Sequence, residues 1–136
     1  MFKKSPPSLS TVTGIGVDLI NQQRIAAVLE RHPELFPKKI LHDLELTDYP
    51  IVFEKQVNYL AKRFAAKEAF SKALGTGIGQ ALSFKDLAVV KDNLGKPFFK
   101  LSERLKANYP NLEAFLSLAD DNPNVIAFCI ISSSLP

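Results

Sequence analysis

Residues 63–79 read RFAAKEAFSKALGTGIG, and this stretch determines how the rest of the chain is interpreted. Small and apolar residues recur along its first part at the spacing of an amphipathic helix. Glu68 and Lys72 stand four positions apart, so a helix places them one above the other on a single face. Gly75, Gly77 and Gly79 follow, and glycine adopts the left-handed conformation with which many helices end. The stretch predicts a helix that stops at a glycine-rich loop.

The polar residues of this helix have two interpretations. A Glu–Lys pair at this spacing often does no more than stabilise an exposed helix. Here, however, Arg63, Lys67 and the glycine loop accompany Glu68 and Lys72. A carboxylate, several cations and a flexible loop together suit a ligand that bears phosphate groups.

Length and composition indicate a single globular domain of 136 residues, with 46% hydrophobic and 23% charged residues. The net charge of +3 suits an acidic partner or a phosphorylated ligand, but it is too small to predict nucleic-acid binding. A single cysteine, Cys129, excludes an internal disulfide. Because it lies in an apolar segment, we expect a buried and unreactive thiol.

The ends and the hydropathy of the chain set further expectations. Residues 1–10 hold two prolines and three serines and are expected to form a flexible tail, followed by one domain over residues 11–136. There is no run of about 18 apolar residues, so no membrane span is predicted. No apolar signal core follows the basic first residues, and we therefore expect a cytoplasmic protein.

The remaining patterns predict an α+β fold, with an antiparallel sheet and helices packed on one side of it. Strands are expected at residues 11–20, 84–91, 97–101, 115–118 and 125–132, the second and third forming a hairpin. Helices are expected after Asn21 up to residue 31, at residues 33–41, from about residue 54 to 74, and after Ser102 up to residue 109.

Asp18 is the second residue that suggests chemistry, because it lies in an apolar segment interrupted by Gly14 and Gly16. A carboxylate in such a strand is costly unless it is paired or binds a metal. Two carboxylates are what Mg²⁺ takes from a protein when water and substrate phosphate supply its other ligands. The sequence leaves open whether Asp18 and Glu68 meet in space.

These motifs resemble the holo-(acyl-carrier-protein) synthases, the short single-domain type of 4′-phosphopantetheinyl transferase. The resemblance runs from about residue 14 to residue 131 and rests on four segments. These are GIGVDLI at 14–20 with Arg24 six residues after Asp18, the stretch 63–79, NLGKP at 93–97, and FLSLAD at 115–120.

The resemblance implies a reaction and a catalytic set. The family transfers the 4′-phosphopantetheine group of coenzyme A to a serine of apo acyl carrier protein, which releases adenosine 3′,5′-bisphosphate and supports fatty acid biosynthesis. Asp18 and Glu68 are then the ligands of Mg²⁺, and Lys72 lies on the pyrophosphate. The proton of the serine goes to Glu68 directly or through a metal-bound water, an alternative that the sequence does not decide.

The resemblance also implies binding residues and an assembly. Arg63 and the turn Gly75-Thr76-Gly77 would help to hold the nucleotide, with the turn that contains Lys96 and Pro97 near the adenine. Arg24 would face the carrier protein. Lys55 and Lys62 are further candidates for contacts with the 3′-phosphate or the carrier. Members of this length form homotrimers with each coenzyme A site at a junction of two subunits.

One departure from the family pattern keeps alternatives open. Many members carry a histidine where this chain has Asp120. Asp120 is either an ordinary turn residue or part of the outer shell of the metal site. The rival functions are a coenzyme A or nucleotide-binding module that does not catalyse transfer, and a basic adaptor for carrier protein or nucleic acid. The adaptor would show steep salt dependence and no need for magnesium.

Overall fold

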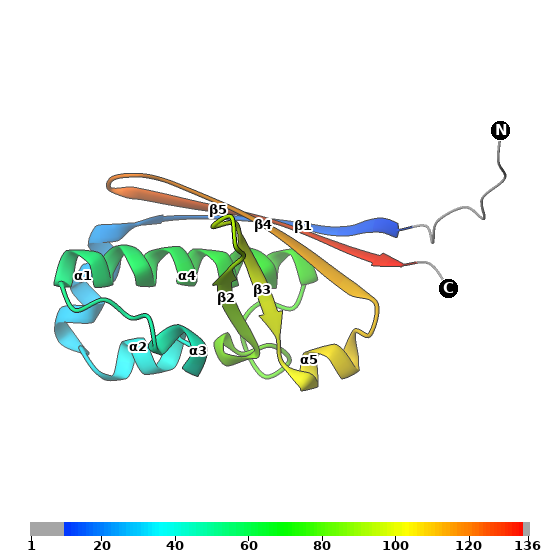
Figure 1. The fold of residues 1–136 in the computed structure, drawn as a ribbon, viewed down its shortest axis with the longest axis horizontal. Helices are drawn as coiled ribbons and strands as arrows, with labels where there is room; N and C mark the ends of the chain where they lie inside the picture. Colours follow the sequence, from blue (N-terminus) through cyan, green and yellow to red (C-terminus); the bar gives the residue numbers. More distant parts are fainter. Residues whose placement is uncertain (1–9, 135–136) are drawn as a thin grey trace, which may run out of the picture.

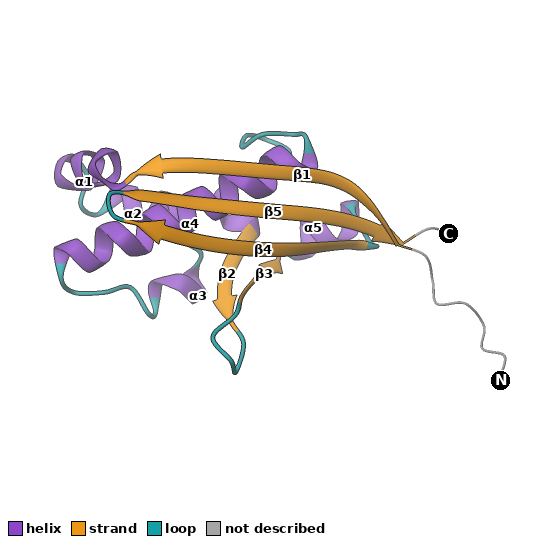
Figure 2. Ribbon diagram, turned by 90° about the horizontal axis from the view of Figure 1, so that it is seen from above, coloured by secondary structure: helices purple, strands orange, loops and turns teal. Residues whose placement is uncertain are grey.

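The computed structural model describes residues 10–134, so the predicted tail lies outside the described residues except for Ser10. A three-stranded antiparallel sheet has the order β1-β5-β4, and a separate two-stranded hairpin pairs β2 with β3 (Figure 2). The strands are β1 Ser10–Asn21, β2 Leu87–Lys91, β3 Pro97–Leu101, β4 Leu112–Asp121 and β5 Asn124–Ser134.

The helices gather on one face of the three-stranded sheet, as the sequence predicts (Figure 1). They are α1 Gln22–Arg31, α2 Leu35–Ile40, α3 Asp43–Leu46, α4 Phe53–Leu74 and α5 Glu103–Asn108. The long helix α4 lies directly beneath β1 and β5, and the buried core forms around it. The fold is therefore α+β. Among the described residues, no helix combines the length and the apolar character needed to cross a bilayer.

The predicted helix signals are confirmed by the backbone. The side chain of Asn21 accepts a 2.8 Å hydrogen bond from the N–H of Gln23 and so caps α1. Gly75 ends α4 with a positive φ of 88°, and its N–H donates to the carbonyl of Ser71 at 3.0 Å. Gly77, with φ 67°, donates to the same carbonyl, so both glycines satisfy the Ser71 carbonyl in the last turn of the helix.

Several predicted boundaries are wrong. Among residues 10–134 the hairpin β2–β3 forms a sheet separate from the larger one. Strand β2 begins only at Leu87, after a 3₁₀ turn at Phe84–Asp86. Between the predicted helix at residues 33–41 and the long helix α4, the chain forms a further helix, α3, which the sequence analysis did not predict and which His42 caps through its Nδ1. Strand β4 is also longer than expected and includes Asp120, which is therefore not a turn residue.

Strand β1 packs very closely against α4. A Cβ on Gly14 would lie 1.8 Å from the carbonyl oxygen of Ala73, and one on Gly16 would lie 1.9 Å from that of Ala69. Only glycine permits this approach, and buried alanines at four-residue spacing give α4 the matching flat surface. Because strand side chains alternate, Asp18 shares the α4-facing side of β1 with the two glycines.

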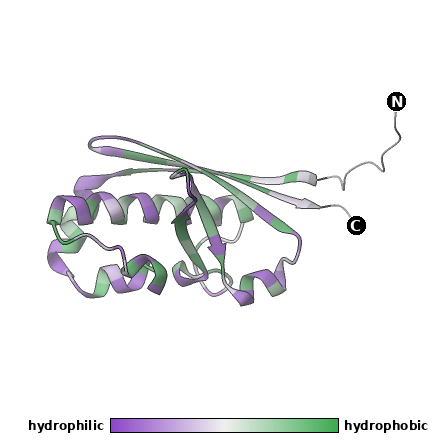
Figure 3. Cartoon of the chain, in the orientation of Figure 1, coloured by the Kyte–Doolittle hydropathy of each residue, from purple (hydrophilic) through white to green (hydrophobic). Residues whose placement is uncertain are grey.

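The opposite face of the three-stranded sheet is apolar and is covered by no other part of the described chain. Its side chains are between 39% and 63% exposed, and Figure 3 shows apolar stretches along all three strands. The exposed side chains are Ile15, Val17, Leu19, Phe115, Ile126 and Phe128. An apolar face of this kind on a globular protein marks an interaction surface.

A buried carboxylate, Asp86, ties the loop after α4 to α5. It accepts hydrogen bonds from Ser102 Oγ at 2.7 Å, from the N–H of Ser83 at 2.9 Å, and from the guanidinium of Arg104. Arg104 also donates to the carbonyl of Gln80 at 3.0 Å. Burial raises the pKa of Asp86, but the hydrogen bonds from Arg104, Ser102 and Ser83 outweigh it and lower the pKa to about 2.

We predict that Gly16→Ala lowers the free energy of unfolding by about 3 kcal/mol, because the new Cβ meets main-chain atoms that cannot rotate away. Urea denaturation measures the change. Gly79→Ala is the matched control: its Cβ has no atom within 4 Å, and the change should stay within about 0.5 kcal/mol. Equal effects of the two substitutions would contradict the role assigned to the β1–α4 contact.

We predict that Asp86→Asn lowers the free energy of unfolding by about 2 kcal/mol at pH 7, through loss of charged hydrogen bonds. The native pKa of Asp86 is below its unfolded value, so this stabilisation is complete above about pH 4 and disappears as the pH falls toward 2. Denaturation of both proteins at pH 7 and pH 3 measures the difference. A difference that grows on acidification would show that another interaction is responsible.

Candidate functional site

Asp18, Glu68 and Lys72 come together along the β1 edge of the sheet, which answers the question that the sequence left open. We call them the carboxylate cluster. Lys72 Nζ lies 3.1 Å from Asp18 Oδ1 and also donates to the carbonyl of Val17 at 3.0 Å. The Asp18 side chain is 15% exposed, whereas that of Lys72 is half exposed. Glu68 precedes Lys72 by one helical turn, so the close approach of β1 to α4 assembles the cluster.

The electrostatics of the cluster show that its two carboxylates interact. Burial raises the pKa of Glu68, and the negative charge of Asp18 raises it further, against the lowering effect of Lys72. Two neighbouring carboxylates with a single ammonium group retain a net negative charge. This charge is a favourable environment for a cation.

The residues of the cluster fit Mg²⁺. This ion usually keeps several waters and takes one or two carboxylates from the protein together with substrate phosphates. Within residues 10–134 no group of three or more His, Cys, Asp and Glu side chains gathers at metal-binding distance. The described part of the chain thus offers the two-carboxylate set, which leaves coordination positions for water and phosphate.

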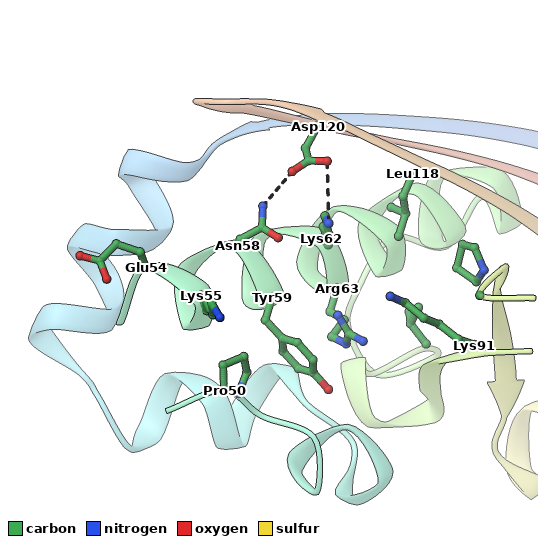
Figure 4. Close-up of a pocket in the computed structure, with 13 residues that line it drawn as sticks. Pro50, Glu54, Lys55, Asn58, Tyr59, Lys62, Arg63, Lys91, Leu118 and Asp120 are labelled. Atoms are coloured by element: carbon green, nitrogen blue, oxygen red, sulfur yellow. Dashed lines mark hydrogen bonds and ion pairs between the residues drawn. The ribbon is translucent and has the colours of Figure 1, made fainter. Parts of the chain in front are cut away.

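A cleft of about 540 Å³ lies on the other side of α4, between that helix, β4 and the β2–β3 hairpin (Figure 4). Its floor and walls combine cationic, aromatic and apolar side chains. The lining residues include Lys55, Asn58, Tyr59, Lys62, Arg63, Lys91, Gly95, Pro97, Leu118 and Asp120. Four of the lining residues are cations and two, Glu54 and Asp120, are carboxylates, so the lining keeps a net positive charge that suits an anionic ligand.

Asp120 lies at the rim of this cleft, toward α4. Its Oδ2 accepts a 3.0 Å hydrogen bond from Asn58 Nδ2, and its Oδ1 lies 3.8 Å from Lys62 Nζ (Figure 4). Asp18 and Asp120 belong to β1 and β4, which form the two opposite edges of the sheet. The contacts of Asp120 within this chain are therefore with the cleft and not with the carboxylate cluster.

Arg63 forms the inner wall of the cleft together with Tyr59. The guanidinium carbon lies 3.4 Å from the centre of the Tyr59 ring, and the Tyr59 hydroxyl donates to the carbonyl of Glu45 at 2.5 Å. Burial lowers the pKa of Arg63, partly offset by Tyr59 and Glu45, which raise it. The sequence analysis did not single out Tyr59, although its position four residues before Arg63 on the same helix is a usable signal.

The other predicted residues have more varied positions. Pro97 lines the cleft, and Lys96 lines a shallower groove against β4 and β5. Gly75, Thr76 and Gly77 are exposed in the loop after α4, one turn beyond Lys72. Arg24 is exposed in the first turn of α1. The structure thus brings Asp18, Glu68 and Lys72 together at one edge of the sheet, and Arg63 and Pro97 together in the cleft at the other edge. Arg24, Lys96 and the loop after α4 belong to neither group.

Comparisons with known proteins give a consistent picture. The family model of the 4′-phosphopantetheinyl transferase superfamily matches residues 14–129. The chain is 42% identical over 125 residues to the holo-[acyl-carrier-protein] synthase of Ruthia magnifica subsp. Calyptogena magnifica, covering 90% of this chain and 98% of that protein.

Solved structures agree. The holo-[acyl-carrier-protein] synthase of Neisseria meningitidis superposes with a TM-score of 0.82 at 40% identity, over 89% of this chain and 98% of that one. The synthase of Bacillus anthracis, in complex with CoA (3′,5′-ADP), has a TM-score of 0.78 at 34% identity, over 90% and 98% of the two chains. The chain therefore belongs to the holo-[acyl-carrier-protein] synthases of the 4′-phosphopantetheinyl transferase superfamily.

Proposed function

We propose that the chain transfers the 4′-phosphopantetheine group of coenzyme A to a serine of apo acyl carrier protein, in support of fatty acid biosynthesis. The products are holo acyl carrier protein and adenosine 3′,5′-bisphosphate. The observation that carries the proposal is the carboxylate cluster: Asp18 paired with Lys72 at 3.1 Å beside Glu68, on the framework of the synthase family. A cytoplasmic location and Mg²⁺ as cofactor are parts of the same proposal.

The reaction is a phosphoryl transfer, in which positioning and charge stabilisation do most of the work. The serine oxygen forms a bond to the phosphorus that carries pantetheine, while the bond from that phosphorus to the bridging oxygen breaks. The electron pair leaves with adenosine 3′,5′-bisphosphate. Glu68 accepts the proton of the serine hydroxyl, either directly or through a water molecule.

Asp18 and Glu68 would hold Mg²⁺, whose contribution when bound is to offset negative charge on the pyrophosphate. Lys72, half exposed and held by Asp18, offers a compact positive charge to the same oxygens. The cations of the cleft are suited to the phosphates of the nucleotide. The exposed Arg24 on α1 is available to an acidic carrier protein. A charge at the edge of such an interface raises the association rate and favours the correct partner.

We predict that Asp18→Asn and Glu68→Gln each reduce transfer by about 100-fold or more, because each removes a carboxylate that binds Mg²⁺. The measurement is the intact mass of apo acyl carrier protein after incubation with coenzyme A, with and without magnesium. Wild-type protein should add one phosphopantetheine only with the metal. Asp121→Asn, an exposed aspartate at the end of β4, is the matched control and should retain the wild-type rate.

The outcomes separate the rival functions. Unchanged turnover in Asp18→Asn or Glu68→Gln would refute the metal assignment. No mass gain with wild-type protein, while calorimetry still detects bound coenzyme A, would support a non-catalytic binding module. Binding of carrier protein alone, strongly weakened by salt and indifferent to magnesium, would support the adaptor.

We further propose that the active assembly is a homotrimer with each site at a junction of two subunits. Two observations support this. Within one chain the carboxylate cluster and the cationic cleft lie at opposite edges of the sheet. The sheet face between these edges is apolar and exposed, which is the character of a subunit interface. Packing such faces around an axis would place the cluster of one copy beside the cleft of the next.

Mixed assemblies test this arrangement. Glu68→Gln disables the cluster and Arg63→Gln disables the cleft, so each variant alone should be nearly inactive. After subunit exchange at equal concentrations, about a quarter of junctions would combine an intact cluster with an intact cleft, restoring about a quarter of the wild-type rate. Light scattering reports the oligomeric state. Exchange without any gain in rate would show that each site lies within one subunit.

A further inference from the structure

Glu45 is a carboxylate that is fully buried where α3, α4 and β2 meet. Its Oε1 accepts from Lys67 Nζ at 2.5 Å and from the N–H of His42 at 2.8 Å. Its Oε2 accepts from the N–H of Val89 at 2.9 Å. Glu45 therefore has a partner on each of the surrounding elements, and it is held in one position.

The charge of Glu45 is balanced by two cations of α4. Lys67 is fully buried, and its ammonium group also donates to the carbonyl of Ile40 at 2.7 Å. Arg63 Nε lies 3.5 Å from Glu45 Oε2. Lys67 alone satisfies the need of a buried carboxylate for a counter-ion. The approach of Arg63 to the same carboxylate therefore calls for a separate explanation.

Arg63 connects this buried network to the cleft. The Tyr59 ring supports one face of its guanidinium at 3.4 Å, and Glu45 lies beside its inner nitrogen, Nε. Its side chain is only 11% exposed, and the exposed part contributes to the wall of the cleft. Within the described chain Arg63 Nε has no hydrogen-bond partner, so the charge of Glu45 and the Tyr59 ring are what hold the guanidinium in place. A buried arginine that is already oriented in this way loses little rotamer freedom when it binds an anion.

We infer that Glu45 is a positioning residue, which orients Arg63 toward an anionic group of the nucleotide in the cleft. The inference rests on the proposed function, because the ligand is the nucleotide part of coenzyme A. Glu45 has a second effect in the same direction. Through the N–H of Val89 it anchors β2, the strand that leads through Lys91 to the hairpin wall of the cleft. One buried carboxylate thereby fixes two walls of the cleft.

A double-mutant cycle tests the inference. Calorimetry gives the Kd of adenosine 3′,5′-bisphosphate for wild type, Glu45→Gln, Arg63→Gln and the double variant. Glu45→Gln keeps the shape of the side chain and removes its charge, whereas Arg63→Gln removes the guanidinium together with its charge. We expect Glu45→Gln to weaken binding by about tenfold in the wild-type background and by less than about twofold when Arg63 is already glutamine. In transfer assays it should raise KM for coenzyme A and leave kcat within about twofold, since Glu45 does not contact the carboxylate cluster.

Two further proteins guard against a trivial loss of folding. Glu45→Gln combined with Lys67→Met removes the buried ion pair as a unit, a change that buried pairs often tolerate. It should fold, and it should show the same coupling to Arg63. Asp86→Asn is the matched control for a buried carboxylate paired with an arginine elsewhere. Its effect on Kd, whatever its size, should multiply with that of Arg63→Gln.

The outcomes are distinct. If the effects of Glu45→Gln and Arg63→Gln multiply, Glu45 is only a structural residue and the inference is overturned, whether or not transfer occurs. If wild type binds the nucleotide with the expected coupling but adds no phosphopantetheine, the inference stands and the proposed transfer fails. If wild type does not bind the nucleotide, both are overturned.

Discussion

The contact between β1 and α4 is the constraint on which the rest of the structure depends. Gly14 and Gly16 allow the strand to lie against the main chain of the helix at Ala69 and Ala73. Side chains on one face recur every two residues along the strand and nearly every four along the helix. The next inward-facing residue of β1 is therefore Asp18, which contacts Lys72, one helical turn after Glu68. The carboxylate cluster follows from this packing, because direct contact between the strand and the helix fixes the distance between their side chains.

This geometry explains which part of the site could be predicted from sequence. The glycines, Asp18 and the Glu68–Lys72 spacing are local sequence patterns. Each can be interpreted without knowing how the rest of the chain folds. The family resemblance named Lys62, Arg63 and Pro97 one by one, but no local pattern indicates that they line one cleft. Tyr59, Lys62, Lys91 and Asp120 come from three elements whose relative placement depends on long-range packing. The separation of the hairpin from the main sheet is likewise a matter of tertiary contacts, and alternation of side chains along a strand carries no information about it.

Buried charge is the second feature that sequence patterns could not locate. Glu45 and Lys67 are both fully buried, yet each belongs to a residue type that is normally exposed. Nothing in the sequence around residue 45 sets this glutamate apart from the other acidic residues. Its burial is intelligible only once α3, α4 and β2 supply donors from three directions. The same holds for Asp86, whose partners lie on the loop before it and on the turn into α5.

The atoms that Gly14 and Gly16 approach are carbonyl oxygens and a backbone nitrogen of α4. Every residue type carries these atoms in the same place, so no replacement on the helix makes room for a side chain on the strand. In an ordinary core, a steric conflict between side chains can be relieved when a neighbouring residue is replaced by a smaller one. No such replacement is possible where β1 lies against α4, because the contacted atoms belong to the main chain. The position of Asp18 relative to α4 is thus set by main-chain atoms, and no replacement of a helix side chain relaxes it.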